Sequence, residues 1–330
     1  MLKPNESGEL MRLPFPDRRG FCHGLTLTAI APLFSNIWST AAVGLERFNI
    51  TTVADGVFAH QGRHELQTPE NFGDISNCGF IVGQDAVAVI DTGGSFRTGT
   101  LLREAVRAAT DKPIKYVVNT HMHPDHVLGN AAFKDDQPTY VAHSKMARAL
   151  SARSERYLTA AKEAMGESSF AGTAVILPTK SIAEKTELDL GGRKLIFAPQ
   201  KTAHTDNDLT IQDTKTGTTF VGDLIFSGHI PTLDGSIVGW QNVLGHLGEE
   251  KLPLIVPGHG PSSMGWNSAS KPVQRYLDIV AEQVRAVIKR GGTINDAIRS
   301  VGLSEQEKWE LFQEFHSRTV TAAFAELEWE

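Results

Sequence analysis

One run of eight residues, Asn-Thr-His-Met-His-Pro-Asp-His at positions 119–126, constrains this chain more than any other stretch. The preceding residues 115–119 include one tyrosine and two valines, which predicts a short buried strand that leads into the run. His121 and His123 are two residues apart, so in an extended segment their side chains point the same way. Pro124 favours that extended form, because the residue before a proline avoids the helical region.

The second half of the run adds two further candidate ligands. Asp125 and His126 are adjacent, so they point in different directions and can reach a second metal beside the first. Imidazole and carboxylate ligands of this kind suit zinc. The alternative is a polar loop that is rich in histidine and binds no metal. We favour the metal site, because capping a turn needs one Asp or Asn rather than three histidines and an aspartate.

Composition limits the class of protein. The chain has 330 residues, of which 41% are hydrophobic and 21% charged, a balance typical of globular proteins. Its net charge is -6, and the body of the chain contains no long basic run. We therefore expect no nucleic-acid partner, and a metallonuclease is a weaker interpretation for the same reason.

The N-terminus has the pattern of an export signal. Arg18 and Arg19 precede residues 25–43, which contain no charged side chain and end in small residues. This arrangement is typical of a secretory signal, and the paired arginines indicate the twin-arginine route. We predict a signal over residues 1–43, cleavage near Ala42 and a periplasmic location. An uncleaved membrane anchor is the alternative, which a proline and several polar residues in the stretch disfavour.

The chain has two cysteines, Cys22 and Cys78. Cys22 would leave with the signal, so the remaining chain could form no internal disulfide. Cys78 lies in a strand-like run, and a small core residue is a better interpretation of it than a nucleophile.

The rest of the chain alternates strand-like runs with helical patterns. Helical periodicity covers residues 96–110 and 144–166 and returns from Pro272 onward. Apolar runs around turn residues predict three hairpins, over residues 80–90, 186–198 and 209–221. Strands mixed with helices predict an α+β fold with two sheets covered by helices. We expect a catalytic domain over residues 44–265, and a helical C-terminal segment over residues 266–330 that packs on it.

Three later residues extend the metal cluster. His204 lies in a polar loop before a strand, Asp223 at the end of a strand, and His259 after the last strand between two glycines. Functional groups are expected in loops at the ends of strands. A lone Asp at such a place is usually a turn cap, and a lone His is usually structural. Their joint occurrence, in this order after the dense cluster, favours a shared site.

These positions resemble the metallo-β-lactamase superfamily. The matching residues are Asp91, His121, His123, Asp125, His126, His204, Asp223 and His259. The resemblance spans roughly residues 48–265. It implies a four-layer αβ/βα sandwich with the metals at one edge of the two sheets, followed here by a helical C-terminal extension.

The resemblance also implies roles for these residues. One metal would be bound by His121, His123 and His204. The other would be bound by Asp125, His126 and His259. Asp223 would bridge both metals, and Asp91 would steady the histidine loop from behind. A bridging aspartate makes the site resemble that of glyoxalase II-type hydrolases more than that of true β-lactamases, many of which lack this residue. His123 occupies a position at which the diiron flavoproteins of the superfamily carry Glu, so the resemblance implies two Zn²⁺ ions per chain.

Further stretches resemble a narrower family, the quinoprotein relay system zinc metallohydrolases, which are relatives of the sulfur-oxidation metallohydrolases. They are residues 60–62, 68–71, 73–75, 203–210, 229–231, 233–236 and 325–330. That family is exported and associated with periplasmic pyrroloquinoline-quinone dehydrogenases. The resemblance therefore implies a quinoprotein dehydrogenase as a partner, beside a small-molecule substrate.

The expected function is hydrolysis of a small ester, thioester or lactam. Two zinc ions about 3.5–4 Å apart would share a bridging hydroxide that attacks the substrate. Asp125 would hold the nucleophile and relay a proton, and His229 is the second catalytic candidate because it lies shortly after Asp223. Candidate substrate-contacting residues lie in the loops; they are His64, Phe72, His143, Asn207, His229 and Trp240.

Two alternatives remain open. One is an enzyme with a single iron that oxidises sulfur or persulfide. The other is a non-catalytic metal-binding partner of a quinoprotein dehydrogenase, which the intact ligand spacing disfavours. Metal identity and stoichiometry separate the first alternative from a dinuclear zinc enzyme. Contact with a membrane is expected only through an uncleaved signal.

Overall fold

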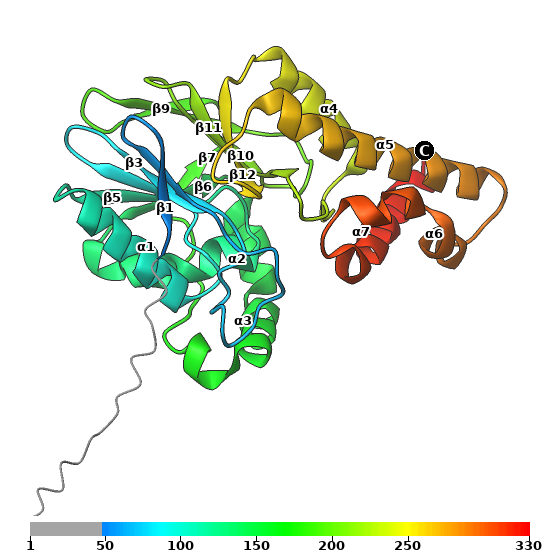
Figure 1. Cartoon of the computed structure of the whole chain (residues 1–330), viewed down its shortest axis with the longest axis horizontal. Helices are drawn as coiled ribbons and strands as arrows, with labels where there is room; N and C mark the ends of the chain where they lie inside the picture. Colours follow the sequence, from blue (N-terminus) through cyan, green and yellow to red (C-terminus); the bar gives the residue numbers. More distant parts are fainter. Residues whose placement is uncertain (1–47) are drawn as a thin grey trace, which may run out of the picture. The chain divides into compact units, whose positions relative to one another are not determined.

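The structure is a computed structural model that describes residues 48–330 (Figure 1). The predicted signal, its cleavage site near Ala42 and Cys22 lie outside the described residues. Within residues 48–330, no helix combines the length and the apolar character that a membrane span requires.

The first sheet has seven strands in the order β1-β2-β3-β4-β5-β6-β7. They are β1 (Ile50–Ala54), β2 (Val57–His60), β3 (Cys78–Val82), β4 (Val87–Ile90), β5 (Ile114–Val118), β6 (Thr139–His143) and β7 (Lys180–Ile182). Strands β1 to β4 pair antiparallel, whereas β4 to β7 pair parallel. The carboxyl ends of β4 and β5 therefore meet at one edge, which brings Asp91 beside the histidine run.

The second sheet has five strands in the order β12-β11-β10-β9-β8. They are β8 (Thr186–Asp189), β9 (Lys194–Pro199), β10 (Leu209–Asp213), β11 (Thr218–Phe226) and β12 (Leu254–His259). The three predicted hairpins are confirmed as the antiparallel pairs β3–β4, β8–β9 and β10–β11. Strands β11 and β12 run parallel, so Asp223 and His259 lie near the same end of this sheet.

Strand alternation builds the layers. In β4, Ala88 and Ile90 face the core between the two sheets, while Val87 and Val89 face the core under helix α1 (Phe96–Ala109). This is the two-residue period of a strand buried on both faces. Helix α3 (Met146–Phe170) packs against β6 of the first sheet, next to the helical layer that contains α1. Helices α4 (Ile237–Glu249) and α5 (Trp266–Lys289) cover the second sheet. The expected four-layer sandwich is confirmed (Figure 1).

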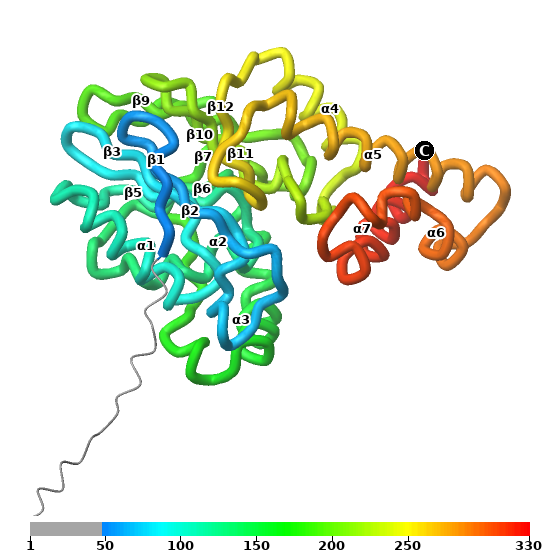
Figure 2. The backbone as a smooth tube through the Cα atoms, in the orientation of Figure 1, coloured from blue at the N-terminus to red at the C-terminus, as the bar shows by residue number. Residues whose placement is uncertain are grey.

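The C-terminal helices follow β12. Helix α5 begins at Trp266, before the helical periodicity that the sequence shows from Pro272, and is followed by α6 (Ile294–Ser300), a 3₁₀ helix (Leu303–Lys308) and α7 (Phe312–Leu327). Figure 2 traces this return of the chain from α5 to α7. The carboxylate of Glu326 in α7 accepts hydrogen bonds from Ser236 Oγ and Ile237 N, both at 2.6 Å. These bonds tie α7 to the start of α4.

Candidate metal centre

Asp91 fixes the histidine run to the first sheet. It follows β4 with a φ of 54°, a left-handed conformation that an aspartate tolerates better than most residues. Its carboxylate accepts hydrogen bonds from Thr120 N at 2.8 Å, Thr120 Oγ1 at 2.7 Å and His126 Nδ1 at 2.9 Å. Strained backbone of this kind persists where the surroundings hold it. Asp91 thus lies behind the ligands, where the resemblance placed it.

The first group of candidate ligands comes from both sheets. It consists of His121, His123, His204 and Asp223, whose ligand atoms lie within 4.8 Å of one another. His204 Nε2 is 2.9 Å from His123 Nδ1 and 3.3 Å from Asp223 Oδ2. His121 Nε2 is 3.6 Å from the same Asp223 oxygen. The structure therefore brings together all four residues that the sequence assigned to this metal.

The second group consists of Asp125, His126 and His259. Helix α2 (Pro124–Val127) presents the first two of these, directly after His123. Asp125 Oδ2 is 3.5 Å from His126 Nε2 and 3.3 Å from His259 Nε2. Asp223 joins this group too, because its Oδ1 is 3.1 Å from His126 Nε2. One carboxylate thus lies between two sets of candidate ligands.

Close contact between two ring nitrogens indicates that a cation fits the first group. His204 Nδ1 donates to the carbonyl of Thr232 at 2.7 Å, and His123 Nε2 donates to Asp234 Oδ2 at 3.1 Å. The nitrogens that face each other at 2.9 Å therefore both present lone pairs. This contact is repulsive without a cation. A tetrahedral zinc ion about 2.0–2.1 Å from its ligands holds them about 3.3 Å apart, close to these spacings.

Unpaired polar atoms support the same conclusion for both groups. Among the described residues, His121 Nε2, His126 Nε2 and Asp223 Oδ1 are buried without a hydrogen-bond partner. Buried polar atoms are normally satisfied, and metal coordination would satisfy these three. The donor set of imidazoles and carboxylates is the one that zinc prefers. Each group of residues therefore fits a metal ion.

The charges of the site also suit a cation. Burial lowers the pKa of His204 to about 3, so its ring stays neutral, as a metal ligand must be. Burial alone would raise the pKa of Asp223, but His126 and His259 outweigh it and hold that pKa well below its usual range. Burial also opposes charge on His259, yet the carboxylates of Asp223 and Asp125 raise its pKa to about 9. Ionised carboxylates in this buried place attract positive charge.

The outer ring nitrogens of the ligands are all anchored. His121 Nδ1 is 3.0 Å from Thr120 Oγ1, and His259 Nδ1 donates to the carbonyl of Ile75 at 2.9 Å. With the bonds of His123, His126 and His204 given above, each imidazole has one nitrogen held and the other directed into the site. Such outer contacts fix the tautomer and the direction of a metal ligand.

Gly258 leaves room for the shared carboxylate. A Cβ atom at this position would lie 1.8 Å from Asp223 Oδ1, so any side chain would displace that oxygen. The glycine before His259 is therefore required by the approach of β12 to Asp223 in β11.

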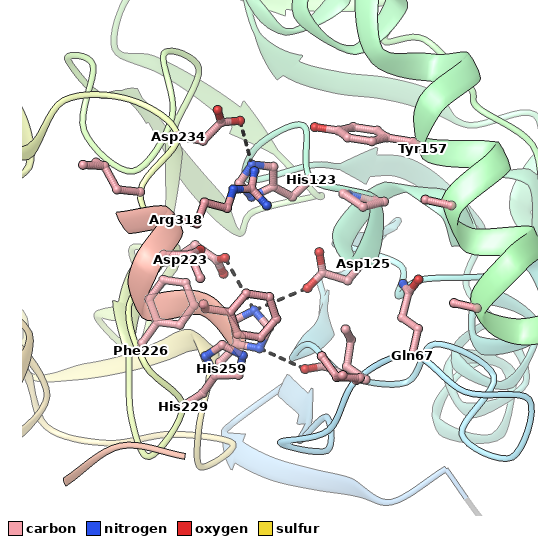
Figure 3. Close-up of a pocket in the computed structure, with 18 of the residues that line it drawn as sticks. Gln67, His123, Asp125, Tyr157, Asp223, Phe226, His229, Asp234, His259 and Arg318 are labelled. Carbon is pink, nitrogen blue, oxygen red and sulfur yellow. Dashed lines mark hydrogen bonds and ion pairs between the residues drawn. The ribbon is translucent and has the colours of Figure 1, made fainter. Parts of the chain in front are cut away.

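A cavity of about 480 Å³ opens onto the two ligand groups (Figure 3). Asp125, Asp223 and His259 lie on its metal side. Helix α3 contributes Arg156 and Tyr157 to its wall, and helix α7 contributes Phe315 and Arg318; the chain between β2 and β3 and the loop after β11 complete it. Sequence reasoning missed this wall. The spacing of Phe315 and Arg318, three residues apart and hence on one helix face, was the available signal.

His229 lies in this cavity, as the sequence predicted. Its Nδ1 donates to the carbonyl of Ile230 at 2.7 Å, so its Nε2 is free to accept a hydrogen bond. Its ring packs against His259, with centroids 4.8 Å apart, and against Phe315 at 5.2 Å. Burial, then the charge of His259, lowers the pKa of His229 to about 3. His229 is therefore a neutral acceptor rather than a cationic group.

The other candidate substrate contacts lie away from the cavity wall. Trp240 is fully buried, donates to the carbonyl of Leu224 at 3.1 Å and packs against His204, so it supports a ligand from behind. His143 is buried and accepts from Lys145 N, and His64 bonds to Glu310. Phe72 and Asn207 are likewise not among the residues that line the cavity. For these five, a loop position did not indicate which way the side chain points.

Asp234 is a further contact that sequence reasoning did not identify as functional. It lies in the loop between β11 and α4 and accepts the hydrogen bond from His123 Nε2. Burial opposes its charge, but the bond from His123 and the charges of Arg153 and Arg318 hold its pKa at about 2. Asp234 therefore stays ionised and orients the ring of a candidate ligand.

Comparison with known proteins agrees with this geometry. The family model of the metallo-beta-lactamase superfamily matches residues 71–259, a range that contains every candidate ligand. Among curated proteins, a linear primary-alkylsulfatase from Pseudomonas sp. (strain ATCC 19151) is 37% identical over 57 residues. That match covers 17% of this chain, and the chain spans only 11% of the length of that relative.

Solved structures share the fold at low sequence identity. A metallo-beta-lactamase from Pontibacter korlensis is 19% identical, with a TM-score of 0.56 over 70% of this chain and 98% of that one. The metallo-beta-lactamase FIM-1 from Pseudomonas aeruginosa, in a mono-zinc form, is 19% identical, with a TM-score of 0.54 over 70% and 94% of the two chains. A relative from Erythrobacter litoralis has the same TM-score at 18% identity, over 71% of this chain and 97% of that one. With the family model matching more than half of its length, this chain belongs to the metallo-beta-lactamase superfamily.

Proposed function

We propose that this chain is a dinuclear zinc hydrolase that cleaves a small ester, thioester or lactam. The observation that carries the proposal is the position of Asp223, whose two oxygens lie 3.1 Å from His126 Nε2 and 3.3 Å from His204 Nε2. These nitrogens belong to different ligand groups. A carboxylate placed between two groups is the arrangement that a two-metal site requires.

The residues that would hold the two ions are those of the two groups. The first ion would be held by His121, His123 and His204. The second would be held by Asp125, His126 and His259, with Asp223 shared. When bound, a zinc pair supplies Lewis acidity toward a substrate oxygen and makes a water molecule more acidic near neutral pH.

The chain's own side chains would then orient the reactants. Asp125 is ionised, because His126 and His259 overcome the effect of burial and lower its pKa, so it can accept a hydrogen bond from the attacking water. His229 can accept a second hydrogen bond at Nε2 from the cavity side. Tyr157 keeps its proton, because burial raises its pKa to about 12. Phe226 and Phe315 exclude water beside these groups.

Metal analysis together with a hydrolysis screen tests the proposal. Purified wild-type protein should contain two zinc ions per chain and should cleave members of a panel of nitrophenyl esters, thioesters and lactams. The His121→Ala variant should lose both zinc and turnover, while the His246→Ala variant, altered at an exposed histidine of α4, should keep both. One iron per chain would contradict the proposal and favour the sulfur-oxidising alternative.

Sulfate ester hydrolysis is a second candidate, favoured by the 57-residue match to the alkylsulfatase. Dodecyl sulfate and 4-nitrophenyl sulfate therefore belong in the same panel. Turnover of either, without turnover of the carboxylic esters, would select this candidate.

We further propose that the enzyme is exported by the twin-arginine route and acts in the periplasm with a quinoprotein dehydrogenase. The support is the paired arginines before residues 25–43 and the stretches that resemble quinoprotein relay system metallohydrolases. N-terminal sequencing of the exported protein should give a start near Ala42; a start at Met1 would refute cleavage. Affinity purification from periplasm should recover a quinoprotein dehydrogenase. Such recovery without hydrolysis across the panel would favour the non-catalytic alternative.

A further inference from the structure

The outer wall of the cavity carries unpaired positive charge. Arg156 of α3 and Arg318 of α7 both line the cavity, and both are exposed to it or to solvent. Within residues 48–330, neither guanidinium forms an ion pair or a hydrogen bond. By contrast, the neighbouring Arg153 is engaged: it lies 3.9 Å from Asp234 and donates to the carbonyl of Ala149. Two free guanidinium groups therefore face the space that a substrate would enter.

A hydrogen-bond donor lies near these charges. The hydroxyl of Tyr157 has no hydrogen-bond partner among the described residues, although the side chain is largely buried. Figure 3 shows this hydroxyl directed from α3 across the cavity, toward the side from which Arg318 extends. The charges of Asp234, Arg153, Arg156 and Arg318 all act on Tyr157, which places these groups in its neighbourhood. An uncharged donor beside several cations is a suitable partner for a carboxylate or another anion.

The one carboxylate on this side of the cavity does not cancel the positive charge. Asp234 lines the cavity, but it is already held by His123 Nε2 at 3.1 Å and by Arg153 at 3.9 Å. The charge of Arg318 also acts on Asp234 and lowers its pKa, although the two groups are not within the 4.0 Å of a close ion pair. The wall therefore retains two cationic side chains against one engaged carboxylate.

Much of the remaining lining of the cavity is apolar. Leu66, Ile75, Ala160, Ala164, Leu233 and Phe315 line it. Cavities of this size and lining typically bury most of a small ligand, and a few polar groups fix its orientation. The two ends of a bound molecule would thus meet different chemistry.

We propose that Arg156, Tyr157 and Arg318 bind an anionic group of the substrate, separated by an apolar segment from the bond that is cleaved. This inference rests on the proposed hydrolase function and names its substrate class: small amphiphilic monoesters, monothioesters or lactams that carry a carboxylate or a similar anion. It also gives the C-terminal segment a role, because Arg318 and Phe315 lie outside residues 71–259, the part that matches the family model. Specificity would then be set by a helix that the superfamily match does not include.

The test uses two esters that differ only at the far end of the acyl chain. The zinc-loaded full chain is assayed with mono(4-nitrophenyl) glutarate, which ends in a carboxylate, and with 4-nitrophenyl pentanoate, which ends in a methyl group. The Arg318→Gln and Arg156→Gln variants should each lower kcat/KM for the glutarate ester about tenfold, mainly through KM, because each removes a charged hydrogen-bond donor. Their kcat/KM for the pentanoate ester should change less than about twofold. Tyr157→Phe should act in the same direction.

Arg148→Gln is the matched control, because Arg148 is exposed on the same helix α3 and does not line the cavity. It should leave both esters unaffected. Equal losses with both esters, or an equal loss in the control, would overturn the inference while leaving the hydrolase intact. A 4-sulfobutyrate ester of 4-nitrophenol shows whether the wall prefers a carboxylate or accepts a sulfonate as well.

A binding measurement keeps the inference testable if neither ester is cleaved. Calorimetric titration of the zinc-loaded wild type and variants with 5-phenylpentanoate and with 5-phenylpentanol separates the anion from the apolar part. Weaker binding of the pentanoate in Arg318→Gln and Arg156→Gln, with unchanged binding of the alcohol, supports the inference. Unchanged binding of the pentanoate in both variants overturns it, whatever the outcome for hydrolysis.

Discussion

The metal side of the cavity and its outer wall are built in opposite ways. On the metal side, His121, His204 and Asp223 are almost fully buried, and they lie on a strand or in loops that connect to strands. Each ligand ring has its outer nitrogen held by another group. On the outer wall, Arg156 and Arg318 are exposed, lie on helices and have no partner within the described residues. The rigid sheets thus fix the chemistry, whereas the helices are free to vary what the enzyme accepts.

The largest effect is expected from removal of a ligand on the metal side. His121→Ala should lower kcat/KM by at least about 10³-fold, because the first metal loses one of its few protein ligands. Zinc content per chain and turnover of the best ester are the measurements. Full activity of a zinc-depleted His121→Ala protein would contradict the role of this site.

A smaller effect is expected one step behind the ligands. In Asp91→Asn, the amide oxygen can still accept the hydrogen bond from Thr120 N, but the amide NH₂ group cannot accept the one from His126 Nδ1. The affinity for zinc should therefore fall about 10–100-fold. Competition with a chelator measures this affinity. Asp135→Asn, at an exposed aspartate, is the control. If both variants bind zinc equally well, Asp91 serves folding rather than the metal.

His229 lies between the two regions, and its replacement shows to which of them it belongs. His229→Ala should lower kcat about tenfold, the equivalent of one lost hydrogen bond, and should leave zinc content unchanged. Loss of zinc in this variant would assign His229 to the metal side. An unchanged kcat, measured under saturating substrate, would reduce its role to packing against His259 and Phe315.

The smallest effect is expected on the apolar part of the wall. Phe315→Ala should raise KM about threefold for esters with an apolar acyl chain, because less apolar surface is buried with the substrate. Zinc content and kcat should stay as in the wild type. Leu303→Ala, at an exposed leucine of the same C-terminal segment, is the control for general loosening of the helices. A drop in kcat instead of a rise in KM would place Phe315 in the chemical step.

The same contrast explains what could be predicted from the sequence. The run at residues 119–126 is short enough for the strand period and one proline to fix its directions, so its ligands are evident without the fold. Two apolar runs around a short turn likewise predict the antiparallel pair of β3 and β4. The positions of Phe315 and Arg318 depend on how α7 docks, which is set by distant contacts such as those of Glu326 with the start of α4. Trp240 shows the reverse error. From the sequence it is a candidate substrate contact in a loop, but it lies on the buried face of α4.

The tie between α7 and the cavity has a thermodynamic consequence. A molecule that contacts both the metal side and Arg318 is bound only while α7 is docked, so its binding energy adds to the stability of that docking. At 100 times its dissociation constant, such a ligand stabilises the docked state by about 2.7 kcal/mol. Amide hydrogens of α7 should therefore exchange more slowly with solvent deuterium when the cavity is filled. By reciprocity, any change that loosens α7 weakens the ligand by the same factor.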